Sequence, residues 1–181
     1  MQKPKKVMIK PLSGIEKRKR INNLQVLSAN AFKKSNICMN NLISVALSQY
    51  GVKEVIGTKD HPQILNYFTS LGFDVAKFKD ETAWCSAFVN WVAKKAGYEH
   101  SNKLTARSWL TVGTSTSNPQ LGDVVVLWRE DPTSWKGHVG FLIKETKRYV
   151  YLLGGNQGNS VSIKAYPKKR VLDYRKLRKD G

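Results

Sequence analysis

One stretch of the chain, residues 80–97, constrains the fold more than any other. Asp80 and Glu81 suit the positive end of a helix, Thr82 suits its N-cap and Gly97 suits its stop. Between these signals the apolar side chains recur at the i, i+3, i+4, i+7 spacing of an amphipathic helix beginning near Trp84. The apolar face consists of Cys85, Phe88, Val89, Val92 and Ala96. The stretch therefore predicts a helix with one buried face and a thiol in its first turn.

Two interpretations of Cys85 are open at this point. Unpaired backbone N–H groups and the helix dipole favour an anion in the first turn, which predicts a lowered cysteine pKa and an available thiolate nucleophile. Alternatively, Cys85 is a small core hydrophobe, because free cysteines are among the most buried residues. Cys38, between Ile37 and Met39, is interpreted as such a core residue.

The residues downstream favour the nucleophile. Gly137 opens a predicted strand that carries His138, and a second predicted strand covers residues 149–153. A glycine-rich loop with Asn156 follows it. A cysteine on a helix, a histidine on a strand and an amide at the end of the next strand form a Cys–His–Asn constellation, in which the amide orients the imidazole. Asn159 is an alternative for the orienting role.

The order of the predicted elements indicates the fold class. Helices are predicted at 40–51 and 62–72, with a further one within 23–34 and a short one at 105–110. Residues 122–128 form a continuous apolar run, which is typical of a central strand buried on both faces. Further strands are predicted from 138, from 149, at 160–166 and at 171–175. Helices first and strands afterwards predict an α+β fold, with an antiparallel sheet packed against the cysteine-bearing helix.

Positive charge is concentrated at the two ends of the chain. The 181 residues carry a net charge of +18, of which residues 1–20 contribute +7 and residues 164–181 contribute +6. We therefore expect residues 1–22 to form a basic arm and residues 23–181 to form a single domain. Basic ends attract polyanions, namely nucleic acid, anionic lipid or the anionic polymers of bacterial envelopes.

The compartment is also predicted from sequence. No apolar run is long enough to cross a bilayer, and no apolar h-region follows the basic start. Synthesis in the reducing cytoplasm without a Sec signal is the expectation.

Several blocks of sequence resemble one enzyme family. ETAWCSAFVNW, ARSWL, GDVVVL, GHVGF and LLGGNQGNSVSI occur in that order. Together they resemble the papain-like cell-wall hydrolases of the CHAP and NlpC/P60 type, particularly the compact branch of phage endolysins and antibacterial effectors. The resemblance covers roughly residues 40–174. It implies a papain-like fold, with Cys85 as nucleophile, His138 as general base and Asn156 as orienting residue.

The resemblance also implies the reaction and the partners. The expected activity is that of a cysteine amidase or endopeptidase that cleaves amide bonds of peptidoglycan through an acyl-enzyme, with no metal or cofactor. Action in the periplasm or cell wall after delivery by a phage or a secretion machinery is expected. Anionic envelope polymers are expected at the basic ends, and an immunity protein is a further expected partner.

Five residues are candidates for substrate binding, each with a simpler alternative. Trp84 and Trp109 are interpreted as groove residues or as core, and Arg107 as a carboxylate ligand or a solvated arginine. Gly155 and Gln157 belong to the glycine-rich loop, where a substrate can approach the backbone. His61 and His100 have no partner at metal-ligand spacing, so no metal site is predicted.

Two other functions are compatible with the sequence. A nucleic-acid-binding module would use the charge and the aromatic residues, although no recognised binding motif interleaves them. A cysteine enzyme of the deamidase or transglutaminase type would use the same triad on protein substrates. DNA binding without wall cleavage would indicate the first function, and modified proteins would indicate the second.

Overall fold

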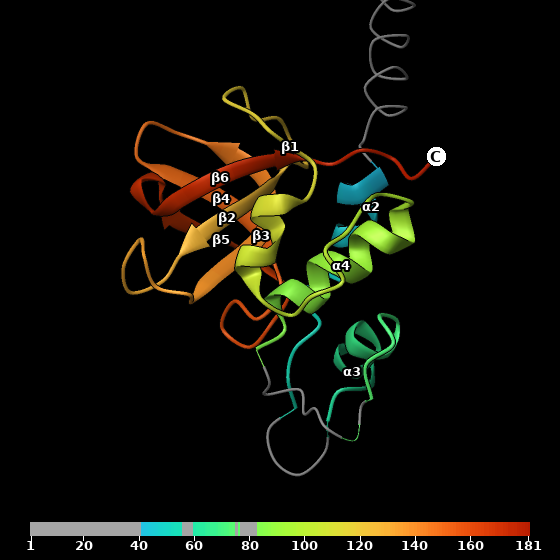
Figure 1. Ribbon diagram of the computed structural model, residues 1–181. Coiled ribbons are helices and arrows are strands. Elements are labelled where there is room, and N and C mark those ends of the chain that lie inside the picture. Colours follow the sequence, from blue (N-terminus) through green and yellow to red (C-terminus); the bar gives the residue numbers. More distant parts are fainter. Residues whose placement is uncertain (1–40, 56–59, 75, 77–82) are drawn as a thin grey trace, which may run out of the picture. The chain divides into compact units, whose positions relative to one another are not determined.

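The computed structural model describes residues 41–55, 60–74, 76 and 83–181 (Figure 1). These residues belong to one compact unit, residues 40–181. The arm predicted at residues 1–22, its boundary with the domain, the helix predicted within 23–34, and Cys38 lie outside the described residues.

Three α-helices come first in the described part of the chain: α2 (Asn41–Leu47), α3 (Pro62–Thr69) and α4 (Cys85–Ala96). Their bounds follow from local signals. Pro62 occupies the first turn of α3, where its missing N–H costs nothing, and the His61 ring accepts a hydrogen bond from the Gln63 N–H. Helix α4 ends at Gly97, whose φ of 73° requires the left-handed conformation. The helix predicted at 62–72 is present but ends at Thr69, and the helix predicted to begin near Trp84 and stop at Gly97 spans Cys85–Ala96. The helix predicted at 40–51 is present but ends at Leu47.

A six-stranded antiparallel sheet follows, with the strand order β1-β6-β2-β3-β4-β5. Strands β2 to β5 run as a meander, and β6 returns to pair with β2. A 3₁₀ helix, η2 (Ala106–Thr111), precedes the sheet, and η3 (Lys168–Arg170) lies between β5 and β6. The strands are β1 (Thr114–Ser115), β2 (Val124–Trp128), β3 (Gly137–Glu145), β4 (Tyr149–Gly154), β5 (Ser162–Pro167) and β6 (Val171–Lys176).

The sheet bears out the predicted α+β fold. Strand β2 lies inside the sheet between β3 and β6, as its continuous apolar run predicts. Strands β3 and β4 are antiparallel neighbours, with Phe141 opposite Leu153. Their hairpin closes where Thr146 donates a backbone hydrogen bond to Tyr149. The cysteine-bearing helix α4 packs on β3 and β4, while α2 and α3 pack against α4.

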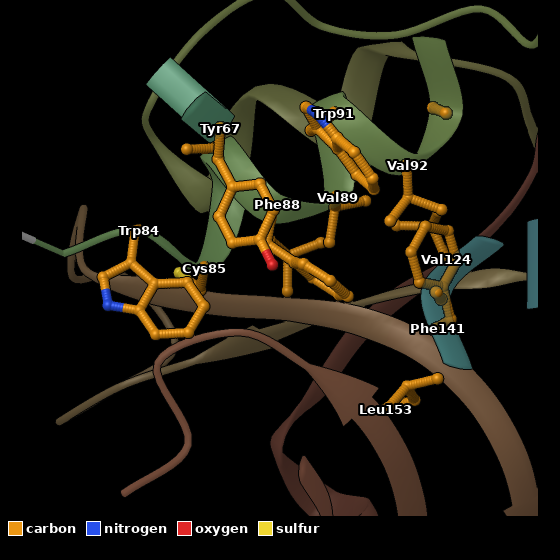
Figure 2. Close-up of a cluster of buried hydrophobic side chains, with 14 of the residues drawn as sticks. Tyr67, Trp84, Cys85, Phe88, Val89, Trp91, Val92, Val124, Phe141 and Leu153 are labelled. Atoms are coloured by element: carbon orange, nitrogen blue, oxygen red, sulfur yellow. The ribbon is translucent and has the colours of Figure 1, made fainter. Parts of the chain in front are cut away.

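The central strand β2 is buried on both faces, and its side chains alternate between two clusters. Val124 and Val126 belong to the core beneath the helices. Figure 2 shows Val124 in this core with Phe88 and Val89 of α4 and Phe141 of β3. Val125 and Leu127 point the other way, into a second cluster with Leu142, Val150 and Leu152. Burial of each large apolar side chain contributes about 1.5–3 kcal/mol, so α4 is held chiefly by its apolar contacts.

The chain after β6 returns to the far end of α4. Lys179 forms an isolated bridge with Tyr98, just beyond the helix stop. The Arg178 guanidinium forms an ion pair with Glu99 at 3.2 Å. In the part of the chain that the structure describes, no helix has the length and apolarity to cross a membrane.

Candidate active site

Cys85 is the first residue of α4 and is only 6% exposed. Trp84 occupies the N-cap position, and its side chain makes no capping hydrogen bond. Thr82, which the sequence suggested as the N-cap, lies outside the described residues. The Cys85 sulfur receives backbone hydrogen bonds from Val139 on β3 and from Ser86. The helix start thus holds the thiol against the strand that carries His138.

Burial raises the pKa of the Cys85 thiol above its ordinary value. The positive charge of Arg129 and the backbone hydrogen bonds of Val139 and Ser86 lower that pKa, but desolvation outweighs them. The first turn of the helix lowers this pKa as expected, but burial outweighs that effect and the net shift is upward. In a buried site, loss of hydration destabilises a thiolate more than the N–H groups at the helix start stabilise it.

His138 is the second residue of β3 and its side chain is fully buried. Its Nε2 lies 3.1 Å from the Gln157 side-chain oxygen. The Gln157 amide nitrogen donates to the carbonyls of Leu152, at 3.2 Å, and Ser162. Because the amide nitrogen is used by two acceptors, the Gln157 oxygen faces the ring, and His138 Nε2 must carry the proton.

Arg129 fixes the same tautomer from the other side of the ring. It follows β2 directly, and its guanidinium lies 3.5 Å from His138 Nδ1. A guanidinium only donates hydrogen bonds, so the Nδ1 lone pair faces it. The imidazole therefore carries its proton on Nε2, and Nδ1 is unprotonated and can act as the base. Among the described residues, no hydrogen bond joins the Cys85 sulfur to the ring. Such contacts often tighten only when substrate binds.

Burial also determines the charge of His138. It lowers the pKa of the imidazole from 6.5 to about 4, against the opposing effect of the Gln157 hydrogen bond. The positive charges of Arg129, Arg170 and Lys164 lower the pKa further. At neutral pH the ring is therefore uncharged, which is the state that a general base requires.

A pocket of about 360 Å³ opens beside the thiol. Trp135, in the loop between β2 and β3, forms an outer wall with 73% of its surface exposed. Leu104 and Thr105, which directly precede η2 in the chain, also line the pocket. The full lining is Ala83, Cys85, Leu104, Thr105, Ala106, Arg129, Trp135, Lys136 and Gly137.

The orienting contact comes from a residue adjacent to the predicted one. Asn156 is in the same loop but has a φ of 56°, so the chain turns there, and the next residue, Gln157, reaches the imidazole. Asn159, the alternative, also has a positive φ, of 59°. Gln157 is 5% exposed and contacts the ring, so it does not line the pocket as a substrate-binding residue would.

The other predicted substrate-binding residues lie outside the pocket lining. Trp84 and Trp109 are fully buried, and their ring N–H groups donate to Glu54, at 2.8 Å, and to Ser86. A Cβ on Gly155 would lie 2.6 Å from the Trp84 ring, so this glycine serves close packing. Arg107 donates to the Pro132 carbonyl at 2.8 Å.

Sequence reasoning missed Arg129 and Lys136, whose side chains line the pocket. One signal was present for Arg129. A charged residue directly after a buried strand lies in the loop at the end of that strand, where binding sites often form. The described residues contain no group of three or more His, Cys, Asp or Glu side chains placed to hold a metal ion.

A comparison with protein-family models gives a match to part of the chain. The family model described as CHAP domain matches residues 77–156, a range that includes Cys85, His138 and Asn156 and stops one residue before Gln157. No curated protein sequence shows significant similarity to the chain.

Proposed function

Because the chain carries a CHAP domain at residues 77–156, we propose that it is a cysteine amidase or endopeptidase acting on bacterial peptidoglycan. CHAP domains as a family supply the general class, amide hydrolysis in the cell wall. The finer proposal is a Cys85–His138–Gln157 triad that works through an acyl-enzyme. Gln157 takes the place that sequence reasoning gave to Asn156.

The fixed tautomer of His138 is the observation that carries this proposal. Gln157 holds the proton on Nε2, and the lone pair of Nδ1 is on the side of Arg129, which lines the same pocket as Cys85. The unprotonated ring nitrogen of His138 lies toward the pocket of the proposed nucleophile, and an amide holds the other ring nitrogen. This is the arrangement of a catalytic triad. No cofactor takes part in the proposed steps.

The reaction proceeds in two halves. His138 Nδ1 takes the thiol proton as Cys85 Sγ attacks the amide carbonyl carbon. The tetrahedral intermediate collapses, the imidazolium gives its proton to the leaving amine, and a thioester remains. Water attacks the thioester with His138 again as base, which releases the acid and the free thiol. The backbone N–H of Cys85 at the start of α4 is the proposed oxyanion donor.

The test is incubation of purified muropeptides with the protein, followed by mass analysis of the products. We expect each cut to add the mass of one water. Cys85→Ala should give no products while retaining the wild-type melting temperature, and Cys38→Ser, which changes the other cysteine, should stay active. Near wild-type cleavage by Cys85→Ala would contradict the mechanism.

The same assay separates the alternative functions. Release of ammonia from protein glutamines, with muropeptides untouched, would indicate a deamidase. Tight DNA binding without wall cleavage would indicate a nucleic-acid module. Delivery by a phage or a secretion machinery, action in the periplasm and inhibition by an immunity protein stay predictions from the family resemblance.

A further inference from the structure

Two cationic side chains line the pocket beside Cys85, and only one is already neutralised. Lys136 forms a 2.6 Å ion pair with Glu130. Arg129 has no carboxylate within ion-pair distance among the described residues. Its one side-chain hydrogen bond in that part of the chain is the long contact with His138 Nδ1, an uncharged acceptor. Arg129 is therefore an exposed cation with unused donors, and it lines the same pocket as Cys85.

The loop does not need this guanidinium for its shape. Arg129 and Lys136 are joined through the backbone, where the Arg129 N–H donates to the Lys136 carbonyl at 3.1 Å. The adjacent turn is held by Asp131, whose carboxylate accepts from the N–H groups of Thr133 and Ser134. The charge on Arg129 thus has no carboxylate partner among the described residues, and its guanidinium is available to a ligand in the pocket.

The guanidinium is close to both reacting groups. It contacts the His138 ring, and its charge acts on the Cys85 thiol. An anion held by Arg129 would therefore lie beside the carbon that the sulfur attacks. The planar fork of an arginine matches a carboxylate with two parallel hydrogen bonds. Leu104, Ala106 and the exposed ring of Trp135 offer apolar walls for the carbon chain next to that carboxylate.

We propose that Arg129 anchors a free carboxylate of the substrate next to the scissile amide. The inference rests on the proposed function and narrows its substrate class to stem-peptide amides that lie within about one residue of a free carboxylate. Substrates in which that carboxylate is converted to a carboxamide bind poorly, because an amide cannot accept two charge-assisted hydrogen bonds from the fork.

The experiment compares soluble muropeptides with their carboxylates free and with each carboxylate converted in turn to a carboxamide. Wild-type protein should prefer the free form of one particular carboxylate by about 10- to 100-fold in kcat/KM, mainly through KM. Arg129→Gln should lose this preference, because turnover of the free form falls further than turnover of the amidated forms. Any loss that comes from the effect of Arg129 on the Cys85 thiol is common to both forms. Arg129→Lys should retain an intermediate preference, because an ammonium pairs without the fork.

Lys136→Gln is the matched control. It removes a pocket cation that Glu130 already neutralises, so the preference for the free carboxylate should remain. Titration of the same muropeptides into Cys85→Ala protein, with and without Arg129→Gln, makes the measurement independent of turnover. The same preference should appear there in the dissociation constants.

Two results would overturn the anchor. These are a wild-type protein that does not distinguish the free from the amidated forms, and a preference that survives Arg129→Gln because both forms lose turnover equally. Each leaves muropeptide cleavage itself intact and so contradicts the inference alone. Absence of cleavage by wild-type protein would instead contradict the proposed function, and the titrations would still decide whether Arg129 binds the carboxylate.

Discussion

At the scale of single residues, burial keeps both reacting groups neutral. The pKa of Cys85 is raised and that of His138 is lowered, in each case mainly because the charged form loses contact with water. The resting site is therefore a thiol beside a neutral imidazole. Proton transfer then accompanies attack on the substrate, and Arg129 favours the developing thiolate through its charge.

The rate of Cys85 alkylation should report this directly. Only the thiolate reacts with iodoacetamide, so a raised pKa predicts a half-maximal rate above pH 9.0, the ordinary value. The Cys38→Ser background isolates Cys85, and unfolded protein gives the reference. Arg129→Gln should move the midpoint higher still, because it removes a charge that lowers the pKa. A midpoint near pH 7 would mean that the thiolate–imidazolium pair forms before substrate arrives.

Gln157 is the residue whose substitution best tests the orienting contact. Gln157→Ala frees the His138 tautomer and should reduce kcat by about 10- to 1,000-fold. Gln157→Glu should also be inactive, because its carboxylate would face the Leu152 and Ser162 carbonyls. Asn156→Ala is the neighbouring control and should lose far less. The opposite ranking in steady-state kinetics would return the orienting role to Asn156.

The difference between Asn156 and Gln157 shows the limit of sequence reasoning at this scale. Residue types and chain order were enough to select Cys85, His138 and the loop. They could not select the side chain within the loop, because the positive φ at Asn156 decides which neighbour points inward. Arg129 was missed for a related reason. Its proposed role depends on the absence of an ion-pair partner among the described residues, which residue type alone does not reveal.

At the scale of elements, α4 is the centre of the fold. Ten of its twelve residues are buried, because α2, α3 and the sheet all pack on it. The start of α3 at Pro62 and the stop of α4 at Gly97 were predictable from proline and glycine punctuation and from the 3.6-residue period. Helices α2 and α3 end earlier than predicted, at Leu47 and Thr69. The apolar run of β2 likewise predicted a strand buried on both faces. The return of β6 beside β2 was not predictable, because strand pairing over a long sequence separation leaves no local signal.

The loop after β4 contacts α4 through Gly155, and this contact allows a sharp test. A methyl group there would lie 2.7 Å from the Phe88 Cβ and closer to the Trp84 ring. Gly155→Ala should therefore destabilise the protein by about 1–3 kcal/mol and shift Trp84, the residue before the nucleophile. Denaturant unfolding, near-UV dichroism and activity would measure the three effects.

Gly158→Ala provides the matched control in the same loop. A Cβ at Gly158 meets nothing within 4 Å, but the φ of 69° makes an alanine strained there. We expect a cost of about 1–2 kcal/mol with an unchanged Trp84 signal. If Gly155→Ala kept both the stability and the aromatic signal of the wild type, the close packing would not constrain the site.

At the scale of the whole molecule, the buried His138 links stability to pH. Its pKa is 6.5 when exposed and about 4 when folded, so the unfolded chain binds more protons between these values. Stability is complete above pH 6.5 and falls as the pH drops toward 4, by about 3 kcal/mol in total. Urea unfolding across this range should show the loss, and His138→Gln should reduce it. A wild-type slope identical to that of His138→Gln would contradict the buried neutral state.

The two basic ends of the chain differ in how their positive charge is used. Residues 164–181 include most of β5 and all of β6, and several of their cations are paired, including Lys168 with Glu145 and Arg175 with Asp173. This segment therefore builds the sheet as well as carrying charge. Residues 1–20, with a net +7, remain the candidate for attraction to anionic envelope polymers.

Removal of residues 1–20 should therefore weaken activity on intact envelopes at low salt and spare the cleavage of soluble muropeptides. Raising salt from about 0.1 to about 1 M shortens the screening length from about 10 to about 3 Å, which should reduce the envelope binding of the full chain to that of the truncated one. Sedimentation with isolated envelopes measures the binding. An equal loss on soluble muropeptides would assign these residues to the fold or the site.

The two ends of α4 have separate uses. Its first residue is the proposed nucleophile, and twelve residues at about 1.5 Å each place its last turn about 18 Å away. There Tyr98 and Glu99 hold the segment at Lys179 and Arg178. A surface, a dye or a second binding protein attached near Lys179 would thus leave the catalytic end unobstructed. This geometry makes that side of the molecule suitable for immobilising the enzyme on a solid support or for building fusions.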